Sequence, residues 1–188
     1  MKGLLRLAGH LDSIVEGFAL VVRWGLLANA LLITGNALSR KLFAIALPTA
    51  FDLQWHFFAA VVLLMAAYAF QRDEHVRIDL FAARLGERGM AWLDLVGIVF
   101  VVLPVCAIMI WVSAPDFARS LLSGETRATR ESVSALPAWI IKSFVPAGFM
   151  LLGLQALAEA IRCVASLQGV APRPVPRRHL AAGPSRDG

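Results

Sequence analysis

The sequence predicts an all-α membrane protein with four transmembrane helices. Hydrophobic residues make up 59% of the 188-residue chain, and the mean hydropathy is +0.70. They gather in long stretches that lack the polar stripe of a surface helix and the alternation of barrel strands. Each stretch approaches the ~20 residues that a helix needs to cross the hydrocarbon layer. The stretches are residues 14–38, about 51–70, 91–113 and 138–161.

The register of the first span depends on Arg23. In a span over residues 14–38 this arginine would lie near the middle of the membrane, where an unpaired charge is costly. In a span over residues 24–43, Arg23 and Trp24 anchor the helix at the inner surface, and the preceding residues lie along the membrane or extend the helix. The second register is favoured. The basic N-terminus also fits a secretory signal, but the apolar run is too long for one.

The later spans carry anchors and prolines. Trp55 and Trp139 are predicted to lie at the outer membrane surface, where indole rings are enriched, with Lys142 beside Trp139. Pro104 and Pro146 each remove a backbone hydrogen bond, so a kink is expected at both positions.

A stripe on the fourth span combines a glycine with polar side chains. At 100° per residue, Gly148, Gln155, Glu159 and Arg162 fall within about 40° of one line. A glycine lets two helices approach closely, and a glutamine in hydrocarbon needs a hydrogen-bonding partner. Glu159 can pair with Arg162 one turn away. The stripe is therefore predicted to face protein, either the chain's own helices or a second subunit.

A polar segment, residues 71–90, separates the second span from the third. Polar and apolar residues alternate over positions 75–80, which indicates a short extended run with one edge toward water or a partner. Asp79 is expected to cap a short helix that Gly86 ends. The alternative is a solvated loop with weak local ion pairs.

The basic residues predict the orientation of the chain. Most of the 18 lysines and arginines lie near the N-terminus, in the polar segment or after the fourth span. By the positive-inside rule, both termini and the polar segment are cytoplasmic. Residues 1–168 are expected to form one transmembrane domain, and residues 169–188, rich in proline and arginine, a disordered cytoplasmic tail.

Nothing in the sequence indicates an enzyme, a cofactor or a metal site. Cys106 and Cys163 form no close pair, and the four histidines lie at or beyond the span ends, where they cannot hold a haem at membrane depth. The chain has a net charge of +5, but its basic residues lie mainly outside the spans, where they orient a membrane protein. No nucleic-acid partner is therefore expected. Two alternatives stay open: a haem- or quinone-binding anchor subunit of a membrane oxidoreductase, and a small channel or exporter.

Two runs of residues resemble the small membrane subunit of the tripartite ATP-independent periplasmic (TRAP) transporters. The resemblance covers residues 36–159. The first run joins Gln54, Trp55 and His56 with the sequence EHVRIDLF at positions 74–81, and with Trp92, Leu93, Asp94 and Gly97. The second joins Arg130, Glu131 and Ser132 with Leu136 to Trp139, Lys142, Val145 to Phe149, Leu151, Leu152 and Gln155.

The resemblance implies a subunit without chemistry of its own in the bacterial inner membrane. In such transporters a periplasmic binding protein delivers an organic acid or related solute to a large multi-spanning subunit, which carries the substrate and ion sites. The small subunit braces the large one. Consistently, the spans show no inverted repeat of the kind that builds a transport site. The motif residues then expected to contact the large subunit are His75, Arg77, Asp79, Glu131, Ser132, Lys142, Pro146, Gly148 and Gln155.

Overall fold

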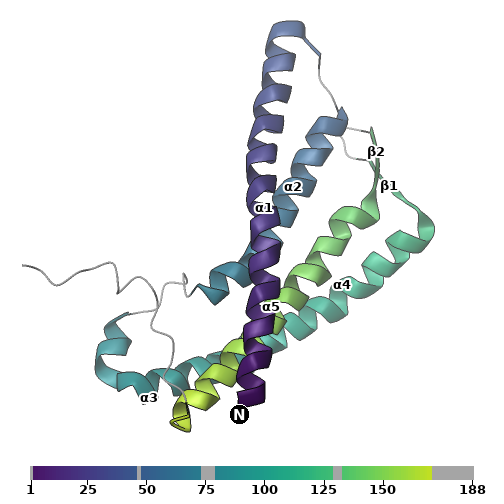
Figure 1. The fold of residues 1–188 in the computed structure, drawn as a ribbon. Coiled ribbons are helices and arrows are strands. Elements are labelled where there is room, and N and C mark those ends of the chain that lie inside the picture. Colours follow the sequence, from purple (N-terminus) through teal and green to yellow (C-terminus); the bar gives the residue numbers. More distant parts are fainter. Residues whose placement is uncertain (1, 46–47, 73–78, 129–132, 171–188) are drawn as a thin grey trace, which may run out of the picture.

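The computed structural model describes residues 2–45, 48–72, 79–128 and 133–170. Figure 1 shows long helices joined by short connections, with a small hairpin at the upper end. The elements are α1 (Lys2–Phe43), α2 (Pro48–Gln71), α3 (Asp79–Gly97), the π-helix η1 (Ile98–Val102), α4 (Leu103–Ser123), β1 (Thr126–Ala128), β2 (Val133–Pro137) and α5 (Ala138–Leu167).

Four helical stretches of the described residues are long and apolar enough to cross a membrane, which confirms the predicted fold class. They are Gly3–Phe43, Thr49–Gln71, Arg88–Ser123 and Ala138–Leu167. Each is longer than the apolar run that predicts it, because the helix continues beyond the run at one or both ends. The third stretch is composite and runs from α3 through η1 into α4.

The helix α5 holds the bundle together. It packs against α1, α2, α3 and α4, and a small core of Val15, Ala67 and Leu151 joins α1, α2 and α5. The start of α1 and the end of α5 lie at the same end of the molecule (Figure 1). Much of the outer surface is apolar, including Trp111, which is 81% exposed, and Leu122, which is 87% exposed. A surface of this kind suits a lipid environment or a membrane partner.

The first helix is a single element of 42 residues. At 1.5 Å per residue it is about 63 Å long, roughly twice the thickness of the hydrocarbon layer. It includes the residues before position 14, which therefore extend the helix. In Figure 1, α1 reaches beyond the other helices at its upper end.

Kinks were predicted at Pro104 and Pro146, and the helix is irregular only near Pro104. Pro104 is the second residue of α4, and the N–H of Leu103, which follows η1 directly, donates to the carbonyl of Ile98. A π turn adds one residue to a turn of the helix and interrupts the regular backbone hydrogen bonds. Here it lies just before Pro104, which has no N–H to donate. The helix α5 runs without interruption through Pro146, which is buried.

A hairpin that the sequence analysis did not predict joins α4 to α5. The strands β1 and β2 are antiparallel, with Thr126 opposite Pro137 and Ala128 opposite Val133. The left-handed Gly124 (φ 61°) ends α4, and the N–H of Ala138 donates to the carbonyl of Glu125 at 2.9 Å. Strands of three and five residues are too short to show a reliable alternation in the sequence.

The polar segment after α2 is described only in part. The helix α3 begins at Asp79 and is interrupted at Gly86 (φ 64°, ψ 175°), as the predicted short helix ending in glycine requires. Positions 73–78, which include His75 and Arg77, lie outside the described residues. The predicted extended run therefore stays a prediction, as does the disordered tail, of which residues 171–188 are not described.

Candidate functional site

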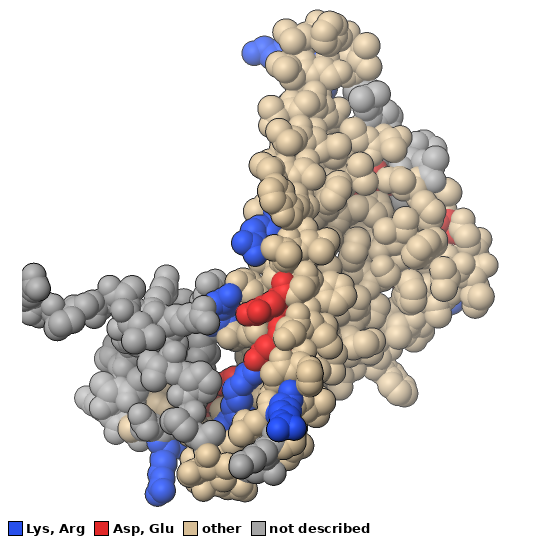
Figure 2. Space-filling view, in the orientation of Figure 1, with Lys and Arg blue, Asp and Glu red and all other residues tan. Residues whose placement is uncertain are grey.

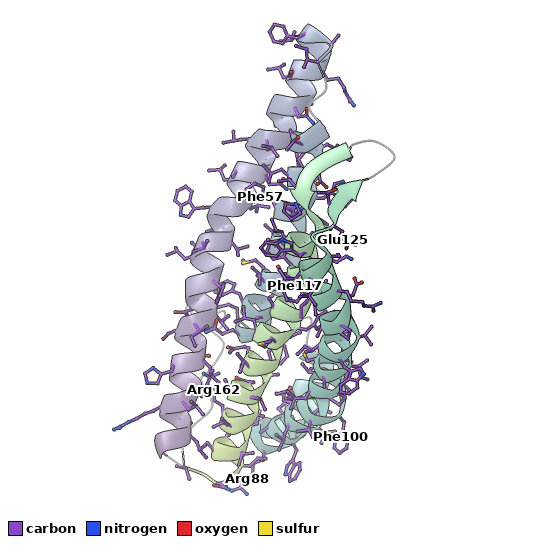
Figure 3. All side chains as sticks on the ribbon, turned by 90° about the vertical axis from the view of Figure 1, so that its right-hand side faces the viewer. Phe57, Arg88, Phe100, Phe117, Glu125 and Arg162 are labelled. Carbon is purple, nitrogen blue, oxygen red and sulfur yellow. The ribbon has the colours of Figure 1, made fainter. Side chains whose placement is uncertain are left out.

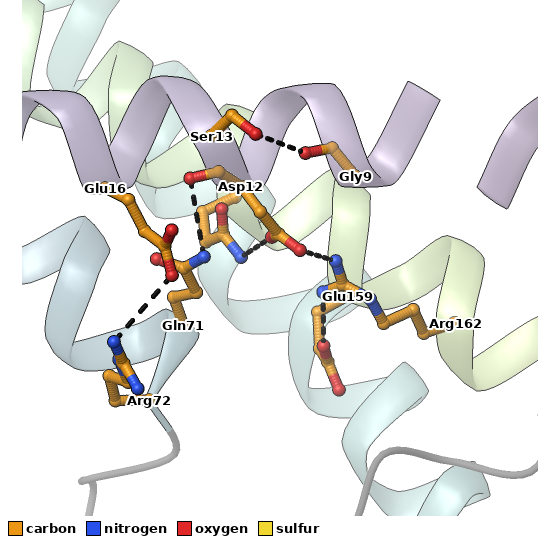
Figure 4. Close-up of polar contacts among 9 residues, drawn as sticks. Gly9, Asp12, Ser13, Glu16, Gln71, Arg72, Glu159 and Arg162 are labelled. Carbon is orange, nitrogen blue, oxygen red and sulfur yellow. Dashed lines mark hydrogen bonds and ion pairs between the residues drawn. The ribbon is translucent and has the colours of Figure 1, made fainter. Parts of the chain in front are cut away.

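Charged and amide side chains at the lower end of the bundle connect α1 to α5. The Nε2 of Gln155 donates to Oδ1 of Asp12 at 2.9 Å, and Nη2 of Arg162 donates to Oδ2 of the same carboxylate. The other Arg162 nitrogen, Nη1, donates to Oε2 of Glu159 at 3.1 Å. Figure 4 shows the carboxylate of Asp12 bonded to Arg162, which in turn reaches Glu159. Gln155 has no exposed surface, so its hydrogen bond is shielded from water.

The helix α2 joins the same group through its last residue, Gln71, and through Arg72, which follows it. The Nε2 of Gln71 donates to the backbone carbonyl of Asp12 at 3.4 Å, and Arg72 lies 3.7 Å from the carboxylate of Glu16 (Figure 4). The guanidinium of Arg72 also lies 5.1 Å from the ring centre of Tyr68. The lower cluster therefore ties three helices together. Its members are Asp12, Glu16, Gln71, Arg72, Gln155, Glu159 and Arg162.

A second group, the upper cluster, connects α4 to α5 near the hairpin. It consists of Asp116, Ser120, Glu125 and Lys142. The Nζ of Lys142 lies 2.5 Å from Oε1 of Glu125 and 3.3 Å from Oδ2 of Asp116. The hydroxyl of Ser120 donates to Oε1 of Glu125 at 2.7 Å. These side chains line an open cavity of about 530 Å³. In Figure 3 Glu125 lies just below the hairpin, and Arg162 lies further down, in the lower half of the molecule.

The pKa of the Glu125 carboxyl is lowered by the upper cluster. The hydrogen bond from Lys142, followed by that from Ser120, holds this pKa below the ordinary value of 4.5. A carboxyl with a lowered pKa stabilises the fold above its ordinary pKa, and this contribution is lost as the pH falls through the lowered value. The hydrogen bonds of Glu125 are therefore expected to contribute to stability at neutral pH and to lose that contribution in acid.

This titration gives a direct prediction. The wild-type chain in detergent is expected to lose thermal stability as the pH falls below 4.5, because Glu125 takes up a proton. The variant Glu125→Gln should lose less over the same range, since its side chain does not titrate. Thermal unfolding followed by circular dichroism at several pH values makes the comparison. Equal acid sensitivity of the two proteins would show that other carboxyls control the loss.

Small residues allow α5 to approach its neighbours closely. A Cβ placed on Gly148 would lie 2.8 Å from both Cβ and the carbonyl oxygen of Leu63 in α2. Such a distance is shorter than real carbon contacts, so the backbone of α5 at Gly148 lies directly against the backbone and Cβ of Leu63 in α2. A Cβ on Gly153 would lie 3.6 Å from the Cβ of Cys106 in α4, an ordinary contact. Gly148 is therefore required for the spacing of α2 and α5.

The predicted stripe on the fourth span faces the chain's own helices. Gly148 packs against α2, while Gln155 and Arg162 bind Asp12 of α1. Of the two alternatives considered for this stripe, the internal packing accounts for these residues. Lys142 was expected as a surface anchor beside Trp139, but here it binds two acids of its own chain.

The other predicted residues lie apart from these clusters. Trp24 is 68% exposed on α1, and Trp55 is 48% exposed and meets Phe58 edge to face at 6.1 Å. Glu131 and Ser132, like His75 and Arg77, lie outside the described residues, and the side chain of Asp79 is not described.

Sequence reasoning missed Asp12, the acceptor at the centre of the lower cluster. Its only signal was an acid at the polar edge of the first apolar run, four residues before Glu16. His56 was named as a motif residue, but its burial was not predicted, nor was the contact of its Nδ1 with the carbonyl oxygen of Asp52 at 2.8 Å. Among the described residues, no group of three or more histidines, cysteines and acids is placed to hold a metal ion.

Comparison with protein families identifies the chain. A family described as "Tripartite ATP-independent periplasmic transporters, DctQ component" matches residues 29–166. This range contains α2 to β2 and most of α5, including Gln155 and Arg162, whereas Asp12 precedes it. Comparisons with curated proteins and with solved structures found no match. The matched range is most of the sequence, so the chain belongs to the DctQ family and is a small membrane component of a TRAP transporter.

Proposed function

We propose that this protein braces the large membrane subunit of its transporter during ion-coupled uptake of an organic acid or related solute, which a periplasmic binding protein delivers. The observation that carries this proposal is that the polar side chains between the helices bind one another within this chain. Gln155 and Arg162 bind Asp12, and Lys142 binds Glu125, so these groups close the bundle on itself. A bundle held at both ends in this way is suited to support a moving partner.

The proposed location is the inner membrane of a bacterium, with the lower cluster toward the cytoplasm. The distribution of basic residues supports this orientation. The upper cluster and the hairpin would then face the periplasm, on the side from which the binding protein arrives. The motif residues His75, Arg77, Asp79, Glu131 and Ser132 are proposed as contacts to the large subunit. No observation favours the alternative of an oxidoreductase anchor.

Reconstituted transport tests this function. Proteoliposomes that contain only this chain are expected to take up no solute, and those with the large subunit alone should lose most of the uptake seen with both subunits and the loaded binding protein. The full set of three proteins is the positive control. Ion-dependent uptake by this chain alone, or full uptake without it, would contradict a bracing role.

A further inference from the structure

An arginine lies alone on the apolar outer surface of α1. Arg23 is exposed, and it forms no hydrogen bond or ion pair with any residue that the structure describes. Leu20 and Leu27 lie within about 60° of it at 100° per residue, and they are 54% and 52% exposed. In Figure 2 charged side chains gather near the lower end of α1, and the surface above them is mostly uncharged.

The two clusters give the depth of Arg23. Along α5, Lys142 of the upper cluster and Arg162 of the lower cluster are separated by about 20 residues, or about 30 Å, which matches the hydrocarbon layer. Asp12 is level with Arg162 because the two side chains are bonded. Arg23 follows Asp12 by three turns of α1, about 16 Å. This spacing favours a position near the middle of the layer over the inner-surface anchor that the sequence analysis favoured.

A contact with α2 gives the same depth independently. A Cβ on Gly25, two residues from Arg23, would lie 3.7 Å from Cδ1 of Phe57. Phe57 belongs to the middle part of α2, which runs from Pro48 to Gln71. Neither headgroup region is therefore adjacent to Arg23, and lipid tails offer no acceptor for a guanidinium.

We propose that the face of α1 carrying Leu20, Arg23 and Leu27 docks against a transmembrane helix of the large subunit that presents a carboxylate at this depth. The inference rests on the proposed function and adds the contact face and its chemistry. A charged residue inside a membrane normally pairs with an opposite charge, and a carboxylate can accept two hydrogen bonds from a guanidinium. The flanking leucines supply the apolar contact that excludes lipid.

A second copy of this chain does not fit the face. The only acids of α1 are Asp12 and Glu16, and both lie in the lower cluster. In two copies inserted in the same direction, the two Arg23 side chains would lie at the same depth. Their like charges would repel each other in a medium of low dielectric constant. Charge complementarity therefore favours a different chain.

Co-purification of the large subunit with the tagged small chain tests the proposal. Arg23→Glu is expected to lower the recovered large subunit by about tenfold or more, with Arg23→Ala intermediate and Arg23→Lys closest to wild type. The matched control is Arg40→Ala, which removes an exposed arginine from the last turn of α1. Since Arg23 has no described partner within the chain, Arg23→Leu should leave the helix content and melting temperature of the isolated chain unchanged.

Disulfide cross-linking gives a second readout that does not depend on the charge. Leu27→Cys should cross-link to cysteines introduced into the large subunit, whereas Ile108→Cys, on the exposed side of α4, should not. Wild-type recovery for both Arg23→Ala and Arg23→Glu would overturn the proposal, as would cross-links from position 27 between two copies of this chain. If the unchanged chain recovers no large subunit, the proposed function itself fails, and this result is distinct from a defect confined to the Arg23 variants.

Discussion

Replacing Gly148 with alanine is expected to force α2 away from α5 and to destabilise the bundle by about 2–3 kcal/mol, although alanine is the better helix former. The new Cβ would lie 2.8 Å from the Cβ and the carbonyl oxygen of Leu63 and 3.0 Å from its carbonyl carbon. Two of these atoms belong to the backbone of α2, so a side-chain rotation cannot relieve the overlap. The larger Gly148→Leu should prevent the native packing.

Gly153→Ala is the matched control on the same helix. Its Cβ would make an ordinary contact of 3.6 Å with Cys106, so the gain in helix propensity of about 1 kcal/mol should remain. Thermal or denaturant-induced unfolding of the detergent-solubilised chain measures both variants. If Gly148→Ala proves as stable as Gly153→Ala, the close approach of α2 and α5 is absent from the folded chain.

Removing the carboxylate of Asp12 is expected to cost about 2–4 kcal/mol of stability. The Asp12→Ala variant would leave the buried amide of Gln155 without its acceptor, and Arg162 would keep only Glu159. An unsatisfied buried amide loses its hydration without compensation, which is why the loss exceeds the value of an exposed ion pair. Unfolding of the isolated chain measures this loss.

The control and the coupling test use neighbouring residues of the lower cluster. Glu16→Ala removes an exposed pair with Arg72 at 3.7 Å and should cost less than about 1 kcal/mol. In a double-mutant cycle, Asp12→Ala and Gln155→Leu together should cost less than the sum of the two single changes, because both remove the same hydrogen bond. Additive losses would show that Asp12 and Gln155 do not interact.

Local features of the sequence were enough to predict the four spans, the break at Gly86 and the protein-facing stripe around Gln155. Each depends on residues within a few helical turns of one another, so hydropathy and helical periodicity report on them directly. The family could also be identified from ordered motifs, and the match over residues 29–166 confirms it.

Local sequence features did not predict which residues bind the polar side chains of the fourth span. Gln155 was predicted to need a partner, but the sequence offered both its own helices and a second subunit. The acceptor, Asp12, lies 143 positions away in the chain. Lys142 likewise had the pattern of a surface anchor until the turn after α4 brought Glu125 against it.

The sequence by itself determined that the chain is a four-helix membrane protein, because a chain that crosses lipid needs long apolar helices whatever their neighbours are. Its ordered motifs determined the TRAP transporter family. Only the tertiary structure decided which helix faces meet, where Gly148 brings α2 against α5, and that Arg23 is level with the middle of the bundle. These features depend on the lateral order and relative height of helices far apart in the sequence, and helical periodicity specifies a face without specifying its partner.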